Sequence, residues 1–431
     1  MNVNKVKPNG LALLPIIVFL ILFIGVGVVQ KDFYSMPAVI GFLIALAVAF
    51  LQTRGISFNE KISIIAKGVG DDNIITMCLI FLVAGAFSGS VSAAGGVNST
   101  VNLGLSLLPP GIAVIGLFII GCFISISMGT SMGTIAALAP IAMGISEKTG
   151  FPIAICIAAV VSGAMFGDNL SMISDTTIAA VRTQGCDMRD KFRKNFLIVL
   201  PAAIATIVIL FFMTNGAHFT VSKDLDYNIF QVIPYILVLV TALIGLNVFI
   251  VLIGGIAFSV IAGLATGAMK VSQIFTSMGE GATGMYDITV ISILVACISA
   301  LVKYNGGFAF ILDNIHKHIH SYKGAEFGVA ALVGLIDCAT ANNTVAIVIA
   351  GPIAKEISDD YGIEPARTAS LLDMFASVFQ GIIPYGAQLL SAASLTGLSS
   401  FDIMPYLFYP YLMAVCGIVS IIISKKKLGK A

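Results

Sequence analysis

The residues best suited to chemistry lie in one polar stretch of an otherwise apolar chain. The segment "MFGDNLSMISDTT", Met165 to Thr177, places two aspartates, an asparagine and four hydroxyl residues after the apolar run "FPIAICIAAVVSGA". Carboxylate, amide and hydroxyl oxygens are the ligands that hard cations such as Na⁺ prefer. A buried carboxylate also favours its neutral form, so one aspartate can exchange a proton for a metal ion. The stretch therefore predicts a Na⁺ site near Asp168 and Asp175.

The composition indicates what surrounds this stretch. Of the 431 residues, 58% are hydrophobic and only 10% are charged, whereas about a quarter of a soluble domain is charged. These values predict an all-α polytopic membrane protein of the cell membrane, with no long polar block for a soluble domain. The formal net charge of +1 predicts no nucleic-acid partner.

Two matches between the halves of the chain indicate an internal duplication. The sequence "AAGG" ending at Gly96 matches "YNGG" ending at Gly307 (307 − 96 = 211), and "ALAPIAMGISEKTG" matches "VIAGPIAKEISDDYG" with Pro140 on Pro352 (352 − 140 = 212). Nearly equal offsets at two distant places favour a repeat over coincidence. We therefore expect one membrane domain built from two repeats, residues 1–222 and 223–431.

The charges of the loops predict that the repeats are inverted. By the positive-inside rule, a cytoplasmic loop is expected before the span Phe196–Met213, with Arg182, Arg189, Lys191, Arg193 and Lys194. The corresponding stretch of the second half, "SLTGLSSFDIMP", has no lysine or arginine. Basic residues near both ends predict cytoplasmic termini: Lys5, Lys7, Lys425, Lys426 and Lys427. Each repeat then crosses an odd number of times, about five.

The odd number of membrane crossings in each repeat constrains where the polar stretches lie. The segment around "SMGTSMGT" is expected to be the tip of a hairpin, formed either by a re-entrant loop or by two full helices, and "MFGDNLSMISDTT" to interrupt one crossing. Unwound backbone at membrane depth needs protein or water to satisfy its N–H and C=O groups, and an intramembrane carboxylate is costly and usually functional. Broken helices at matching places in inverted repeats are typical of secondary transporters.

The second half contributes a corresponding tip, "DCATANNT", and a corresponding break, "FQGIIPYGAQLLSAAS". The predicted cation- and substrate-binding residues of the first half are Thr130, Ser131, Asp168, Asn169, Ser171, Ser174, Asp175 and Thr176. Those of the second half are Asp337, Thr340, Asn342, Asn343 and Thr344, with Asp373, Gln380 and Gln388 as further candidates. A structural alternative exists for the aspartates, because "SDTT" also suits the N-cap of the helix that follows.

The segment "FGDNLSMISDTT" is similar to the G-D-N-L-S-x-x-S-D-T-T signature of the NhaC-type Na⁺/H⁺ antiporter family, and "GTSMGT" followed by "APIA" resembles the hairpin of that family. The resemblance implies an ion-transporter fold, with Asp168, Asn169, Ser171, Ser174, Asp175 and Thr176 in the ion-binding segment, and a homodimer as one expected assembly. The chain length, the "NNT" tip and "DMFASVFQGIIPYGAQLL" most resemble the YuiF-type branch, which is associated with amino-acid transport.

These observations predict a secondary transporter, not an enzyme, that works by alternating access with Na⁺ or H⁺ as coupling ion and no other cofactor. A small amino acid is the expected cargo, because helix N-termini can hold its carboxylate and an aspartate its amine. Na⁺/H⁺ antiport without an organic substrate is the alternative. An ion channel would not explain the duplicated breaks, and an intramembrane aspartyl protease needs two acids that meet from different helices.

Overall fold

The computed structural model of the chain describes residues 7–30, 36–107, 110–172, 174–214, 225–244, 246–317 and 319–424. Within these ranges the regular structure is entirely helical, as the composition predicts. The first half contains η2 (Gly10–Leu13), α1 (Leu14–Gln30), α2 (Ala38–Gln52), α3 (Phe58–Val69), α4 (Asp72–Ala93), α5 (Gly96–Leu107), α6 (Pro110–Met128), α7 (Ser131–Thr149), α8 (Ile153–Leu170), α9 (Asp175–Gln184) and α10 (Met188–Thr214).

The second half contains α11 (Ile229–Leu243), α12 (Val248–Thr266), η3 (Val271–Gln273), α13 (Ile274–Thr283), α14 (Tyr286–Tyr304), α15 (Gly307–Lys317), α16 (Tyr322–Thr340), α17 (Asn343–Tyr361), α18 (Pro365–Ile382), α19 (Ala387–Thr396), α20 (Ser400–Ile403), η4 (Met404–Tyr406) and α21 (Phe408–Ile423). The basic residues Lys5 and Lys425 to Lys427 lie outside the described residues.

Several of these helices suit a bilayer by length and composition. Within the described ranges four are long and apolar enough to cross, namely Ile74–Ala93, Ile153–Gln184, Met188–Thr214 and Phe249–Thr266. The pair Ser400–Tyr406 and Phe408–Ile423, bent by 56°, makes a fifth if it is one span. The described residues also include shorter apolar helices of 10–17 residues, as expected where spans are broken or tilted.

The same order of helices occurs in both halves. Helices α6, α7, α8 and α9 correspond to α16, α17, α18 and α19, and each helix of the second set begins 212 residues after its counterpart, as Ser131 and Asn343 do (343 − 131 = 212). Helix α10 and the segment from α20 to α21 follow in the same register. The boundary between the repeats and their opposite orientation in the bilayer stay predictions.

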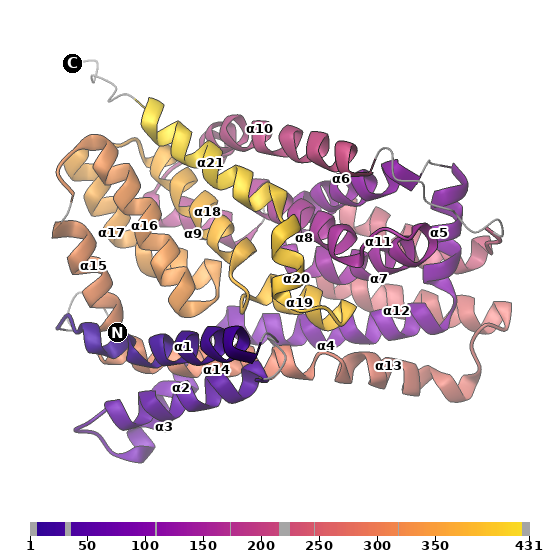
Figure 1. Cartoon of the computed structure of the whole chain (residues 1–431), viewed down its shortest axis with the longest axis horizontal. Helices are drawn as coiled ribbons and strands as arrows, with labels where there is room; N and C mark the ends of the chain where they lie inside the picture. The colour runs from indigo at the N-terminus through magenta and orange to yellow at the C-terminus, as the bar shows by residue number, and fades with distance from the viewer. Residues whose placement is uncertain are drawn as a thin grey trace.

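Each half contributes helices that pack on helices of the other half. Helix α14 of the second half packs on α2 and α3 of the first, while α4 of the first half packs on α12 and α13 of the second. Figure 1 shows α1, α2, α3, α13 and α14 along one side of the molecule and α10 and α21 along the opposite side. Helix α7 packs on α8 and α17 packs on α18, and α18 packs on α8, with α9 against α17 and α19 against α7.

Each predicted hairpin is a pair of helices joined by a tight tip. Helix α6 turns into α7 through Gly129, with φ 68°, and α16 turns into α17 through Ala341, with φ 47°. Both residues adopt the left-handed conformation, which glycine accepts freely but which costs an alanine roughly 1–2 kcal/mol. Thr130 and Asn342 then cap α7 and α17 by accepting hydrogen bonds from the N–H groups of Gly133 and Val345.

Both predicted helix breaks are present. Helix α8 ends at Leu170, Ser171 is extended, and α9 begins at Asp175. Helix α18 ends at Ile382, and α19 begins at Ala387, after an interruption of four residues that ends at Gly386. The freed backbone ends of four short helix segments therefore lie within the helical core, where they need polar partners.

Candidate functional site

Asp168 is the buried carboxylate beside the first break. It lies in the last turn of α8 and its side chain is buried, with 5% exposure. Ser131 Oγ, from the first turn of α7, donates to Asp168 Oδ2 at 2.9 Å, and Ser174 Oγ donates to Oδ1 at 2.6 Å. Thr176 Oγ1 lies 2.9 Å from Ser174 Oγ. The hairpin tip and the break thus place hydroxyl oxygens around one carboxylate.

The second half reaches the same point through two amide side chains. Gln388 Nε2, from α19, donates to Ser131 Oγ at 3.0 Å. Gln380 Nε2, from α18, donates to Gln388 Oε1 at 2.6 Å and to the carbonyl oxygen of Ala341 at 3.2 Å. A continuous chain of polar contacts therefore joins Asp168 to the tip of the second hairpin.

A cavity of about 240 Å³ opens beside Asp168. The predicted residues that line it are Thr130, Ser131, Asp168, Ser174, Asp175, Thr176, Asn342, Asn343, Thr344, Gln380 and Gln388. Three further lining residues, Gly129, Met132 and Ala387, lie in the predicted tip and break, and the sequence did not point to the remaining ones, Thr76, Ile80, Asn247 and Phe249. The lining found among the described residues has two aspartates and no lysine, arginine or histidine.

Five helices begin at the wall of this cavity. Each contributes its N-cap or its first residue, namely Thr130 for α7, Ser174 for α9, Asn247 for α12, Asn342 for α17 and Ala387 for α19. A helix N-terminus carries a partial positive charge and free N–H groups, so it can bind an anionic group without a basic side chain. The cavity thus combines two carboxylates, suited to a cation, with N-termini suited to a carboxylate.

The structural alternative for "SDTT" is partly correct. Ser174 is the N-cap residue of α9, but its hydroxyl bonds Asp168 and makes no capping hydrogen bond. Asp175 is the first residue of α9, is exposed, and faces the cavity. The acid therefore remains accessible to a ligand.

Five predicted residues lie away from this cavity. Ser171 Oγ donates to the carbonyl of Ile126 at 2.6 Å, and Thr340 Oγ1 donates to that of Ile336 at 2.9 Å. Asp337 is fully buried, and neither of its oxygens has a hydrogen-bond partner among the described residues. The other two, Asn169 and Asp373, belong to a separate network.

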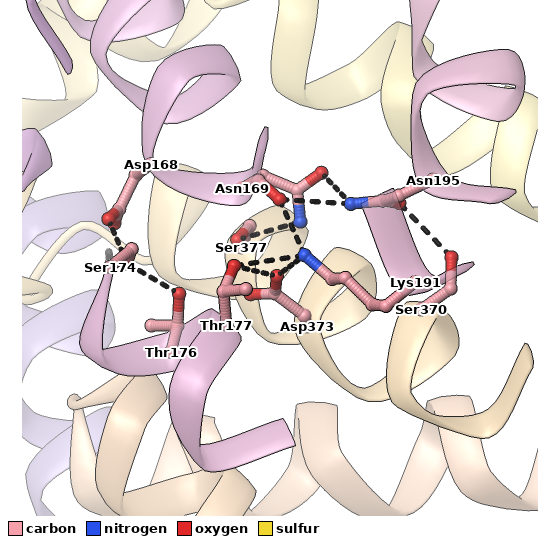
Figure 2. A network of polar contacts seen from close by, with 10 residues as sticks. All are labelled: Asp168, Asn169, Ser174, Thr176, Thr177, Lys191, Asn195, Ser370, Asp373 and Ser377. Atoms are coloured by element: carbon pink, nitrogen blue, oxygen red, sulfur yellow. Dashed lines mark hydrogen bonds and ion pairs between the residues drawn. The ribbon is translucent and has the colours of Figure 1, made fainter. Parts of the chain in front are cut away.

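This second network is centred on Lys191 (Figure 2). Its ammonium forms an ion pair with Asp373 Oδ2 and donates to the carbonyl of Asn169 at 2.8 Å and to Thr177 Oγ1 at 2.9 Å. Thr177 Oγ1 itself donates to Asp373 Oδ2 at 2.9 Å. Asn195 donates from Nδ2 to Asn169 Oδ1 at 2.7 Å, and its Oδ1 accepts from Ser370 Oγ at 3.2 Å.

The prediction that Lys191 lies in a loop is wrong, while the side of the membrane on which it lies stays a prediction. Helix α10 begins at Met188, eight residues before the expected span. The side chain of Lys191 is 1% exposed, and that of its partner Asp373 is fully buried. Lys191 is buried because it lies on the same face of α10 as Asn195 and Val199, which follow it at intervals of four residues and are also buried. Extending the apolar stripe backward from Val199 would have found both polar residues.

Two hairpin tips and two broken helices that meet at a polar cavity inside a helical membrane protein define a secondary transporter. Comparisons with known proteins agree with this class. The sequence pattern of the Na⁺/H⁺ antiporter family matches residues 9–214 and 227–424. The chain belongs to the Na⁺/H⁺ antiporter family, and it is a multi-pass membrane transporter rather than a protease.

The relatives are distant but match along nearly their whole length. The chain is 23% identical to the malate-2H⁺/Na⁺-lactate antiporter of Bacillus subtilis, covering 93% of this chain and 92% of the relative. It is 23% identical to the Na⁺/H⁺ antiporter NhaC of the same organism, with 87% and 90% covered. It is 24% identical to the arginine/ornithine antiporter ArcD of Halobacterium salinarum, with 95% and 91% covered.

Among solved structures, the YdaH transporter of Alcanivorax borkumensis is similar with a TM-score of 0.41 and 14% identity, over 81% of this chain and 86% of that one. The family match and the two relatives whose names include Na⁺ support cation-coupled transport.

Proposed function

We propose that the protein carries a small amino acid across the membrane by alternating access, coupled to Na⁺ or H⁺ bound at Asp168. The observation that carries the proposal is the cavity in which Asp168 and Asp175 face the N-termini of five helices. A zwitterion needs both kinds of partner, because its amine pairs with a carboxylate and its carboxylate with free N–H groups.

The size and charge of the cavity support this class of cargo. About 240 Å³ is below the roughly 300–1,000 Å³ of pockets for drug-sized ligands, so the cargo is small. A dicarboxylate would bring a second negative charge beside two aspartates, with no basic side chain on the described lining to balance it. One relative bears the name of an amino-acid antiporter, for arginine and ornithine, and another that of a malate/lactate antiporter, so the proposal rests on the cavity.

Na⁺/H⁺ antiport without organic cargo is a second candidate. The carboxylate of Asp168 and the hydroxyls of Ser131, Ser174 and Thr176 form a compact set of oxygens. Such a set suits a hard cation and needs nothing from the second half of the chain. The relative NhaC bears the name of that activity.

Thermal unfolding of the purified protein distinguishes the two candidates. The protein would be screened against amino acids and small dicarboxylates, with Na⁺ or N-methylglucamine as cation and over a range of pH. Asp168→Asn would be compared with Asp360→Asn, an exposed acid at the end of α17. A ligand that binds only the native state raises the Tm by mass action.

We expect one class of small amino acid to raise the Tm only with Na⁺ or at low pH, in the wild type and Asp360→Asn but not in Asp168→Asn. A response to Na⁺ alone, with every organic solute inactive, would favour antiport. If Asp168→Asn kept every response of the wild type, the proposed site would be wrong.

A further inference from the structure

The ammonium of Lys191 lies at the C-terminal end of the broken helix α8, in a cluster apart from the cavity (Figure 2). Three oxygens of different kinds contact it: the Asn169 carbonyl, the Thr177 hydroxyl and the Asp373 carboxylate. These oxygens come from three helix segments, α8, α9 and α18. Neither Lys191 nor Asp373 lines the cavity beside Asp168.

This set of oxygens is one that a monovalent metal ion would use. In transporters with broken helices, carbonyls at the C-terminal ends of half-helices coordinate the coupling cation, and the negative end of the helix dipole adds to the attraction. Carboxylate, hydroxyl and carbonyl oxygens are also the ligands of hard cations. Asp373 Oδ1 has no hydrogen-bond partner among the described residues, so the cluster has a further free acceptor.

The fold does not require charges at these two positions. At the 212-residue offset, Asp373 corresponds to Val161 (373 − 161 = 212) and Lys191 to Ile403 (403 − 191 = 212), and both apolar residues are fully buried. A buried ion pair stabilises no better than well-packed apolar residues, because desolvation offsets its attraction. The pair therefore calls for an explanation other than stability.

We propose that this cluster is a second monovalent-cation site, occupied in this conformation by the ammonium of Lys191 in place of a metal ion. The side chain acts as a tethered cation on α10, and it neutralises Asp373 while the break between α8 and α9 is in the present arrangement. When Lys191 is withdrawn or removed, Na⁺ or an ion of similar size binds the same oxygens.

The test removes the tethered cation and offers a free one. All variants carry Asp168→Asn, so that the cation site of the proposed function does not contribute and the two proposals fail separately. The variants are Lys191→Ala, the charge-free pair Lys191→Ala/Asp373→Val, and the control Lys194→Ala. Lys194 lies on the same helix in a partly exposed ion pair with Glu364. Each protein is purified in high Na⁺ and its Tm is measured against Na⁺ in N-methylglucamine buffer.

We expect Lys191→Ala to be the least stable protein without Na⁺ and to gain about 2 °C in Tm per tenfold increase in Na⁺. Lys194→Ala and the charge-free pair should show no such gain, since one keeps the ammonium and the other lacks the carboxylate.

An equal Na⁺ response in Lys191→Ala and Lys194→Ala would overturn the proposal, as would a gain that persists in the charge-free pair. The proposal would also be overturned if the charge-free pair could be purified in high Na⁺ and Lys191→Ala could not, because Na⁺ would then have failed to replace the missing ammonium.

Discussion

At the scale of residues, three buried aspartates differ in what compensates their polarity. Asp168 accepts hydrogen bonds from two hydroxyls and opens on the cavity. Asp373 pairs with an ammonium. Asp337 is fully buried without a hydrogen-bond partner among the described residues. Neutralising each carboxylate therefore has a different physical consequence.

Asp373→Asn and Asp337→Asn form a matched pair for measuring this difference. Asp373→Asn leaves the ammonium of Lys191 buried without its counter-charge, and we expect a loss of about 3–5 kcal/mol in the free energy of unfolding. Asp337→Asn breaks no side-chain hydrogen bond to any described residue, and we expect a change below about 1 kcal/mol. Denaturant unfolding of both variants in the same detergent measures the two values, and equal losses would contradict the assigned contacts.

The sequence predicted the residues around Asp168 well because polarity in an apolar run stands out. Eleven predicted residues line the cavity, although ligand binding by them stays a prediction. The network of Lys191 was missed because a lysine next to Arg189, Arg193 and Lys194 has the composition of a loop. The buried lysine differs from these neighbours in its four-residue spacing from Asn195 and Val199 and in its partner Asp373 on α18, which is distant in sequence.

At the scale of elements, the site depends on how closely α6 approaches α8. A Cβ on Gly163 of α8 would lie 2.3 Å from the backbone carbonyl oxygen of Phe118 in α6, and one on Gly167 would lie 2.6 Å from that of Cys122. Small residues allow such close contacts between membrane helices. The glycines therefore set the position of the hairpin that carries Ser131 relative to Asp168.

Gly163→Ala should disturb this contact, and Gly116→Ala should not. The first substitution forces the two backbones apart, with an expected loss of about 1–3 kcal/mol in the free energy of unfolding and weaker cation binding. The second lies in α6 with open space around the added methyl group and should stabilise the helix by up to about 1 kcal/mol. Tm and Na⁺ titration of both variants test this, and identical behaviour would contradict the packing.

Both helix breaks could be predicted from the sequence, but the start of α10 could not. Both breaks follow from Gly, Pro and polar residues in apolar runs, and both are found. The start of α10 at Met188 was missed because hydropathy marks where a span becomes apolar, whereas a helix extends into polar sequence when its buried face has polar partners.

At the scale of the whole molecule, the duplication organises the fold. Hairpins, breaks and the helices that follow them recur at one sequence offset. Helix α4 of the first half packs on the second half, and α14 of the second half packs on the first. Because each half supplies a tip and a break to one cavity, a movement of either half changes the site. This arrangement suits alternating access.

The inverted orientation predicts that corresponding loops lie on opposite sides of the membrane. In a variant without the native cysteines, Asp187→Cys after α9 and Ser394→Cys near the end of α19 would report the two sides; both positions are exposed. An impermeant thiol reagent added to intact cells should label Ser394→Cys. It should label Asp187→Cys only after the membrane is permeabilised. Labelling of both from outside would contradict the inversion.

The most direct test of cation-coupled transport at Asp168 is flux into proteoliposomes. A labelled small amino acid that stabilises the protein would be followed under an imposed Na⁺ or pH gradient, for the wild type, Asp168→Asn and Asp360→Asn. We expect gradient-driven accumulation in the wild type and Asp360→Asn, and a loss of about tenfold or more in Asp168→Asn, since at least one charge-assisted contact to the cation is removed. Cation-coupled transport at Asp168 would be contradicted by uptake at the wild-type rate in Asp168→Asn. It would also be contradicted by wild-type uptake that is independent of both gradients.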